Sequence, residues 1–223
     1  MIDRDPPDEI WCLGDTVGYG PRPNECCQLV RERSGLTLVG NHDLVALGSA
    51  DVGVEDFNPE AGTASVWTSK QLTEETREFL SSLSPQAARE GFELFHGSPI
   101  DPVWDYVIDQ YSAADALART EAPVVLVGHS HVPTAISLAD GALTGGVATA
   151  DFSAVLGTSR WLFNPGSVGQ PRDGDPRAAF LRLDRVSGQA RFERVAYPVA
   201  RTQEEIRERG LPDSLAERLA HGL

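Results

Sequence analysis

The stretch VVLVGHSHVP, residues 124–133, sets the interpretation of the whole chain. Four consecutive aliphatic residues between Pro123 and Gly128 predict a short strand that is buried on both faces, as in a parallel sheet. His129 and His131 follow at its carboxyl end, where open α/β sheets bind ligands. Side chains two residues apart point to opposite sides of an extended segment, so we expect the backbone to turn at Gly128. Two neutral imidazoles brought together in this way suit a transition metal.

Three other strand-like runs end in the same manner. The runs at 10–13, 36–39 and 92–95 each stop at a glycine and a side chain that can bind a metal. The side chains at these ends are Asp15, Asn41 with His42, and His96. Four of the five histidines lie at such ends, and only His221 does not. This repetition favours one shared site at the carboxyl ends of the strands.

Composition and charge exclude several classes of protein. With 223 residues and 41% hydrophobic content, we expect one sizeable domain, or a domain with an appendage, and a substantial core. We expect no membrane span and no signal peptide, and the three cysteines lack a C-x-x-C spacing, which favours free thiols in the cytoplasm. The formal net charge of −14 argues against tracking along nucleic acid. The single lysine, Lys70, excludes a Walker A site and argues against Schiff-base chemistry.

The spacing of apolar and capping residues predicts the remaining elements. Helices are expected at 24–33, 42–48 with Asn41 as cap, 58–72 with Asn58 as cap, from Thr73, and at 112–121. After Pro133, short strands at 134–138, 143–148, 160–163, 178–183 and 189–197 predict a second, largely antiparallel sheet, with turns at Asp140-Gly141 and Ser187-Gly188. Two capping-box patterns, Thr202 with Glu205 and Ser214 with Glu217, predict two helices in the tail.

The candidate ligands indicate which metals the site could bind. One carboxylate, one amide oxygen and three imidazoles suit Mn²⁺, Fe, Zn²⁺ or Ni²⁺ and are poor ligands for Ca²⁺. Asp15 has two carboxylate oxygens and could bridge two cations. Such a pair can hold a hydroxide and clamp the oxygens of a displacement at phosphorus. His42 could then act as the general acid, oriented by Asp43 or another carboxylate.

These motifs resemble those of the calcineurin-like metallophosphoesterases. The similar segments are Gly14-Asp15, Gly40-Asn41-His42-Asp43, His96-Gly97 and Gly128-His129-Ser130-His131. The GYGP loop at 18–21, HGSP at 96–99 and NPGSVG at 164–169 are similar to small bacterial and archaeal phosphodiesterase-type members. The resemblance covers most of the chain. It implies an α/β fold, a four-layer α/β/β/α sandwich with two mixed β-sheets, the first sheet within about 1–133 and the second within about 134–223.

The resemblance also implies roles for individual residues. Asp15 would bridge two divalent transition metals, with Mn²⁺ first and Fe, Zn²⁺ or Ni²⁺ as alternatives. The second metal site would be completed by Asn41, His96 and His129, and the first would be served by His131. His42 would donate the proton or stabilise the transition state. Arg172 is a candidate phosphate contact, with a structural salt bridge as the alternative.

One family motif is missing from the sequence. Members open with a strand that ends in Asp-x-His, and no Asp-x-His occurs in this chain. The first metal site therefore keeps only Asp15 and His131, and the strand next to residues 10–13 would be missing. Met1 could be an internal methionine mistaken for the start, the chain could be truncated, or another segment could fill the gap. The first explanation is favoured because the downstream motifs are intact.

Three functions follow from the sequence. The leading one is a metal-dependent phosphodiesterase or phosphatase that hydrolyses a small phosphorylated substrate through a metal-bridging hydroxide. The alternative is a catalytically impaired binding or scaffold protein, because the first metal site is incomplete. The third, a serine hydrolase suggested by Gly128-His129-Ser130, is disfavoured because Val132 replaces the glycine of a nucleophile elbow. An exposed sheet edge would favour a homo-oligomer.

Overall fold

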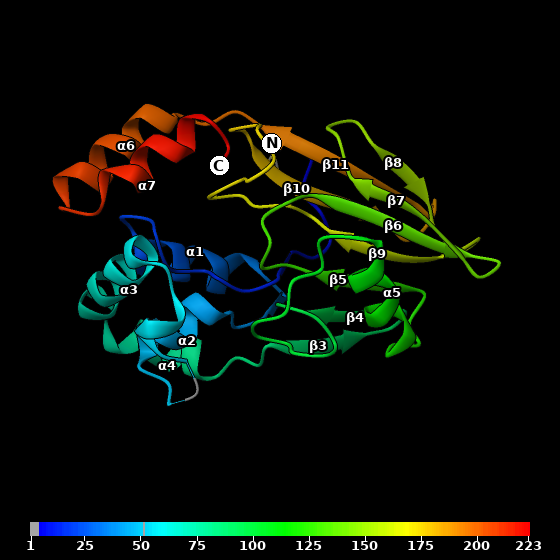
Figure 1. Ribbon diagram of the computed structural model, residues 1–223, viewed down its shortest axis with the longest axis horizontal. Coiled ribbons are helices and arrows are strands. Elements are labelled where there is room, and N and C mark those ends of the chain that lie inside the picture. The colour runs from blue at the N-terminus through cyan, green and yellow to red at the C-terminus, as the bar shows by residue number, and fades with distance from the viewer. Residues whose placement is uncertain (1–4, 51) are drawn as a thin grey trace. The chain divides into compact units, whose positions relative to one another are not determined.

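The computed structural model describes residues 5–50 and 52–223 (Figure 1). The chain forms two compact units, whose positions relative to one another are not determined. The first unit runs up to Pro85 and includes Pro198–Ala220, and the second comprises Gln86–Tyr197 with His221–Leu223. Helices and several sheets occur together, which confirms the α/β class. The four-layer stacking stays a prediction.

The first unit combines a two-stranded parallel sheet with helices. Strand β1 (Trp11–Cys12) pairs with β2 (Leu36–Thr37), and Trp11 lies opposite Leu36. Both strands are shorter than the apolar runs predicted. The helices and 3-10 turns of this unit are α1 (Pro23–Arg33), α2 (Asn41–Leu47), η2 (Val54–Asp56), α3 (Pro59–Gln71), α4 (Glu74–Ser81), α6 (Val199–Glu208), α7 (Asp213–Glu217) and η3 (Arg218–Ala220).

Helix starts test the capping predictions. Asn58 Oδ1 accepts a hydrogen bond from Ala61 N at 2.9 Å, which confirms Asn58 as the cap of α3. Thr73 caps α4 in the same way. The two tail helices exist, but they begin before the predicted caps, so Thr202 and Ser214 lie inside them. A proline stands immediately before each of these helices, and the S/T-x-x-E pattern also occurs within helical turns.

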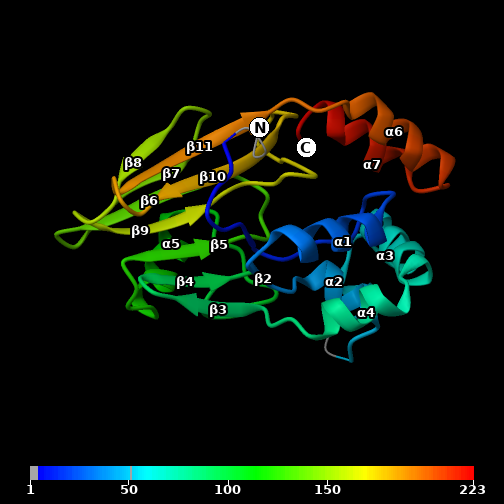
Figure 2. The same ribbon diagram turned by 180° about the vertical axis from the view of Figure 1, so that it is seen from behind.

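The tail helices complete the core of the first unit. Helices α6 and α7 lie side by side (Figure 2). Ile206 of α6 and Leu215 of α7 are each 1% exposed and pack with Ala64 of α3. Because these side chains leave water only when the three helices meet, the tail belongs to the fold of this unit.

The second unit contains two sheets. The six-stranded sheet has the order β3 (Gln86–Arg89), β4 (Phe92–Phe95), β5 (Val124–Val127), β9 (Arg160–Asn164), β6 (Thr134–Ala139) and β7 (Ala142–Val147). The three-stranded sheet has the order β10 (Ala178–Asp184), β11 (Gln189–Val195) and β8 (Ser153–Val155). The bounds predicted for β4 and β5 are confirmed, and the parallel pairing of β5 with β4 fits the parallel sheet expected for residues 124–127.

The predicted division between the sheets was wrong. The strands at 134–147 and 160–164 join the sheet of β4 and β5 instead of a second sheet. Strand β9 pairs with β5 in parallel and with β6 in the antiparallel sense. Consecutive Leu162 and Phe163 are both 0% exposed, so β9 is buried on both faces. A period of two shows which side chains are buried but does not show which strands become neighbours.

A helix and the second sheet cover the faces of the six-stranded sheet. Helix α5 (Gln110–Ala118) packs Ala116 and Leu117 into the cluster that contains Val125 and Leu162. Phe163 of β9 meets Phe192 of β11 with ring centroids 6.2 Å apart. The second unit therefore has three layers: helix, six-stranded sheet and three-stranded sheet.

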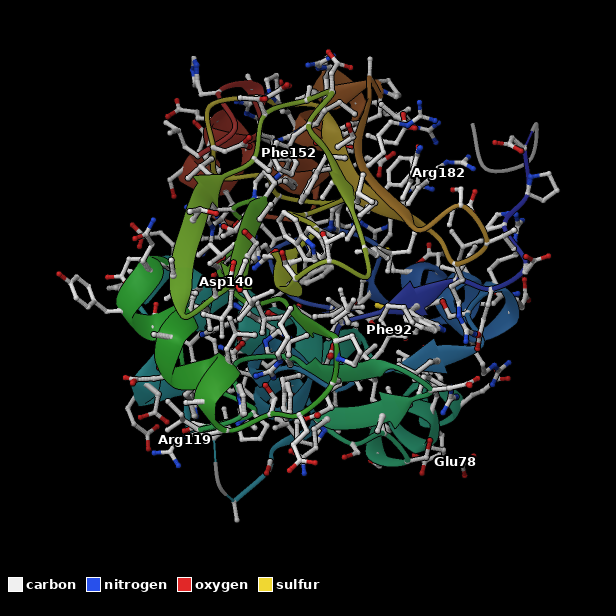
Figure 3. All side chains as sticks on the ribbon, turned by 90° about the vertical axis from the view of Figure 1, so that its right-hand side faces the viewer. Glu78, Phe92, Arg119, Asp140, Phe152 and Arg182 are labelled. Carbon is white, nitrogen blue, oxygen red and sulfur yellow. The ribbon has the colours of Figure 1, made fainter. Side chains whose placement is uncertain are left out.

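In the second unit, one predicted helix start was wrong and one predicted turn is confirmed. Helix α5 starts two residues before the predicted Ser112 because Asp109 Oδ1 accepts from Ser112 N at 2.8 Å. The Asp140-Gly141 turn is confirmed, with φ values of 50° and 77° and with Ala139 paired to Ala142 (Figure 3). Across the described residues, no helix has the length and apolar character needed to cross a membrane.

Candidate functional site

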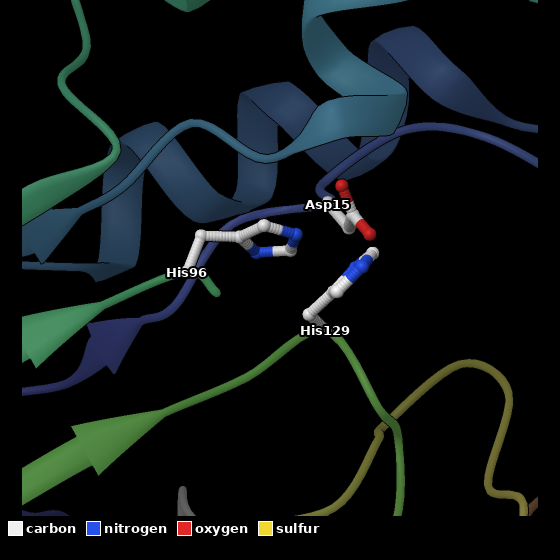
Figure 4. Close-up of side chains that lie close together, drawn as sticks. All are labelled: Asp15, His96 and His129. Atoms are coloured by element: carbon white, nitrogen blue, oxygen red, sulfur yellow. The ribbon is translucent and has the colours of Figure 1, made fainter. Parts of the chain in front are cut away.

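Asp15 is the ligand candidate nearest the start of the first unit. It follows β1 in a left-handed backbone conformation, with φ 53° after Gly14 at φ 95°. Its Oδ1 accepts a hydrogen bond from the backbone N–H of His42 at 3.0 Å. The carboxylate, which Figure 4 draws, is thereby tied to the first turn of α2. A helix N-terminus favours negative charge at this position.

Asn41 and His42 open helix α2 and are 2% and 5% exposed. Gly40, rather than the predicted Asn41, is the N-cap residue. The Asp43 carboxylate accepts from Gly40 N and from Val17 N, both at 2.9 Å. These two bonds give Asp43 a capping role, and they connect the Asp15 loop to the helix start.

The imidazole of His42 is held between aromatic rings. Its centroid lies 4.3 Å from that of Tyr19 and 4.8 Å from that of Phe57. Gly18 has φ 106°, and a Cβ atom added there would lie 2.8 Å from His42 Nδ1. Only glycine therefore fits at this position without displacing the imidazole.

His96 and His129 are brought together in the second unit. They follow β4 and β5, which are neighbouring parallel strands with Phe95 opposite Val127. Their ring centroids are 5.1 Å apart, and the residues are 1% and 5% exposed (Figure 4). The expectation that carboxyl strand ends gather these two side chains is confirmed.

The turn after β5 was predicted at the wrong residue. His129 and His131 themselves have positive φ, 59° and 61°, and Gly128 does not belong to the residues with positive φ. This conformation costs a residue other than glycine about 1–2 kcal/mol. The buried Asn164 amide donates to Gly128 O at 2.6 Å and to Ser130 Oγ at 2.9 Å, and so holds the loop in place.

The two histidines of this loop are in a state that can bind a metal. His131 Nδ1 lies 2.8 Å from the carbonyl oxygen of Gln170, so Nδ1 carries the proton and Nε2 keeps its lone pair. In the described part of the chain, neither ring nitrogen of His129 makes a hydrogen bond of normal geometry, although a weaker contact with the Trp104 backbone acts to raise its pKa. Burial, followed by the charges of His96 and Arg172, lowers the pKa of His129 to about 3. Burial and the charge of Arg172 lower the pKa of His131 to about 3.

This state fits a metal ligand better than a structural side chain. A buried polar atom without a hydrogen bond normally costs about 1–3 kcal/mol, so it needs an explanation. Both imidazoles are neutral at physiological pH and present lone pairs. Divalent transition metals bind such nitrogens together with carboxylate and amide oxygens, and the residues present therefore fit the metal that the motifs suggest.

Arg172 lies beside the histidine loop. Its Nη2 donates to Gln170 Oε1 at 2.9 Å, and its backbone N–H donates to His131 O at 3.3 Å. Gln170 is 5% exposed and therefore connects the guanidinium to the histidine loop from inside the protein. The adjacent Asp173 forms a buried ion pair with Arg194.

Several residues of this region were not predicted as site residues. Tyr106 stacks on His129 with centroids 3.9 Å apart, and Trp104 meets the same imidazole edge-on at 6.3 Å. Gln170 and Asn164 support the histidine loop, as described above. The aromatic pair in DPVWDY, shortly after His96, was the only signal in the sequence for the ring contacts.

The candidate residues fall into two groups. Asp15, Asn41 and His42 belong to the first unit. The second unit contains His96, His129, His131 and Arg172. The first group provides oxygen ligands and one packed imidazole, and the second provides imidazole nitrogens, those of His129 and His131 being neutral, and a fixed guanidinium.

Solved structures share this fold. A metallophosphoesterase from Sphaerobacter thermophilus matches with a TM-score of 0.89 and 38% identity, over 99% of this chain and 90% of its own. A hypothetical protein from Pyrococcus horikoshii matches with a TM-score of 0.72 and 19% identity, over 96% of this chain and 84% of its own. The second likeness concerns the fold alone.

Sequence relatives point to the same family. An uncharacterized protein of Methanocaldococcus jannaschii is 35% identical over 96% of this chain and 86% of its own length. A symmetrical bis(5′-nucleosyl)-tetraphosphatase of Actinobacillus pleuropneumoniae is 29% identical over 55% of this chain and 44% of its own length. The family model described as a calcineurin-like phosphoesterase superfamily domain matches residues 2–186. The chain therefore belongs to the calcineurin-like phosphoesterase superfamily, as its motifs predicted.

Proposed function

We propose that this protein is a metal-dependent phosphoesterase that hydrolyses a small phosphorylated substrate. The observation that carries the proposal is the buried, neutral imidazole of His129, whose two ring nitrogens have no normal hydrogen bond among the described residues. Membership of a phosphoesterase family supports it.

The family resemblance assigns the metal ligands within this proposal. Asp15, Asn41, His96 and His129 would hold one ion, and Asp15 with His131 would hold another. Bound divalent cations activate water and neutralise the charge of phosphate oxygens. The use of Mn²⁺, the number of ions and the cytoplasmic location stay predictions.

The chain's own residues supply the other parts of the reaction. His42 would donate a proton to the leaving oxygen, and its contacts with Tyr19 and Phe57 hold the imidazole in one orientation. Arg172, fixed by Gln170, would bind a phosphate oxygen. A local positive charge is needed because the protein has a formal net charge of −14.

The substrate class can be narrowed by assay. The names of the shorter matches describe enzymes acting on bis(5′-nucleosyl) tetraphosphates, so phosphoanhydrides belong in a substrate panel beside phosphodiesters and phosphomonoesters. Each is a small phosphorylated molecule of the kind proposed here.

The test uses bis(4-nitrophenyl) phosphate with the full chain in Mn²⁺. We expect hydrolysis that stops when EDTA removes the metal and that falls about 100-fold or more in His42→Ala. His221→Ala, which changes a histidine outside the motifs, should retain wild-type turnover. Hydrolysis that survives EDTA, or equal rates for the two variants, would contradict the proposal. Metal binding without turnover would instead indicate the binding or scaffold role.

A further inference from the structure

The segment that follows β4 exposes several apolar side chains, and one of them, Tyr106, contacts His129. Of the twelve large hydrophobic residues exposed in the described chain, four fall within residues 100–111. These four are Ile100 at 47%, Tyr106 at 44%, Ile108 at 65% and Tyr111 at 85% exposed. We call residues 97–106 the rim loop, since they connect His96 to these side chains. Such a concentration of exposed apolar surface marks a binding surface more often than a random distribution does.

Tyr106 is directed at the candidate site. Its ring stacks on His129 with an interplanar angle of 19°, while Trp104 meets the same imidazole at 81°. Stacking covers one face of the Tyr106 ring, and 44% of the residue remains exposed. A partly exposed aromatic side chain therefore lies immediately next to a proposed metal ligand.

Hydrogen bonds hold the rim loop in this shape. The Ser98 hydroxyl, on a residue that is 0% exposed, donates to Asp105 Oδ2 at 2.5 Å and accepts from Ile100 N at 3.0 Å. Asp101 Oδ1 accepts from Trp104 N at 3.0 Å. A Cβ atom on Gly97 would lie 2.6 Å from Asp101 O, so the loop closes tightly over that glycine. The aromatic rings are thus positioned before any ligand arrives, which lowers the entropic cost of binding.

We propose that Tyr106 binds the organic group of the substrate by stacking, and that this group is a nucleobase. The inference rests on the proposed function, because Arg172 and the metal would hold the phosphate while Tyr106 holds the base. A flat heteroaromatic ring matches a rigid, exposed phenol ring better than an aliphatic chain or a sugar does. Tyr106 is then a specificity-determining residue.

The probe ligands are adenosine 5′-monophosphate and ribose 5-phosphate, which differ only in the base. Binding to the metal-loaded full chain is measured by calorimetry. We expect adenosine 5′-monophosphate to bind about 10-fold tighter or more. Tyr106→Leu should lose this preference and bind the two ligands about equally. Tyr106→Phe, which keeps the ring, and Tyr111→Leu, which removes a tyrosine without a ring contact to His129, should both retain the preference.

The outcomes separate this inference from the proposed function. Equal affinity of the wild-type protein for the two ligands, binding of neither ligand, or equal behaviour of Tyr106→Leu and Tyr111→Leu would overturn the inference. Turnover of phosphodiesters with no preference for the base would leave the proposed function intact. A preference for the base without any turnover would support Tyr106 stacking and contradict the proposed function alone.

Discussion

The loop that carries Asp15 and the loop that carries His129 and His131 both contain left-handed residues, but different hydrogen bonds hold the two loops. Each places its ligand candidates in the left-handed region, with φ 53° at Asp15 and 59° and 61° at His129 and His131. In the first unit, backbone N–H groups donate to the carboxylates of Asp15 and Asp43. In the second unit, the buried amide of Asn164 donates to the histidine loop.

The hydrogen bonds of the two loops differ because the side chains that the loops carry differ in charge. Carboxylates gain from backbone donors at a helix start, where the helix dipole also favours negative charge. Neutral imidazoles must keep their lone pairs, so the loop that carries them is held through its backbone and through Ser130. We infer that the first unit presents oxygen ligands and that the second presents imidazole nitrogens, and the substitutions below test this comparison.

The largest effect is expected from removing the amide that supports the histidine loop. Asn164→Leu leaves the half-buried Gly128 carbonyl and the buried Ser130 hydroxyl without the Asn164 donor, so we expect a loss of about 3 kcal/mol in the free energy of unfolding. The matched change in the first unit is Asn24→Leu. Asn24 is half-buried, but its hydrogen bonds with Gln71 O and Thr73 N lie at the surface, so their loss should cost less than about 1 kcal/mol. Urea denaturation measures both, and equal losses would argue against a special role for Asn164.

A smaller effect is expected where Gly18 approaches His42. Gly18→Ala brings a Cβ to within 2.8 Å of His42 Nδ1, so the imidazole must move, and turnover should fall about 10-fold. Gly141 has a similar positive φ of 77° but nothing within 4 Å of an added Cβ. Gly141→Ala should therefore lower stability by about 1 kcal/mol and leave turnover unchanged. Steady-state kinetics measure the turnover of both variants. Equal turnover would contradict the role given to the Gly18 contact.

Some of these local features could be predicted from the sequence, and others could not. The bounds of the strands at 92–95 and 124–127 could be predicted because glycine, proline or histidine flanks each run. The motifs also identified the histidines that meet. The positive φ of His129 and His131 has no such signal, because it depends on Asn164, more than thirty residues later. The sheet neighbours of β9 and the stacking of Tyr106 also depend on packing between residues that are far apart in the sequence.

Gln170 contacts both Arg172 and His131, but through different atoms. Its side chain accepts from Arg172, whereas its backbone carbonyl binds His131, so Gln170→Met removes only the first contact. We expect KM to rise about fivefold, with unchanged metal content. Substrate titration and elemental analysis of the same sample measure the two quantities. A loss of metal, or an unchanged KM, would refute this division of roles.

The smallest effect concerns an exposed ion pair of the first unit. Hydrogen bonding to Arg22 lowers the pKa of Glu205 to about 2 from its ordinary value of 4.5. A lowered carboxylate pKa stabilises the folded state above pH 4.5, and this contribution disappears as the pH falls toward 2. Glu205→Gln should therefore melt slightly below the wild-type protein at pH 7 and together with it near pH 2. A gap in melting temperature that widens with acid would contradict the assignment.

The most direct test of the account is the metal content of His129→Ala. The wild-type protein, purified in Mn²⁺ and analysed for bound elements, should retain about one equivalent per chain or more. His129→Ala should lose most of that metal, while His221→Ala should match the wild type. If the wild-type protein retains none, or if His129→Ala retains as much as the wild type, the buried imidazole is not a metal ligand and the central claim fails.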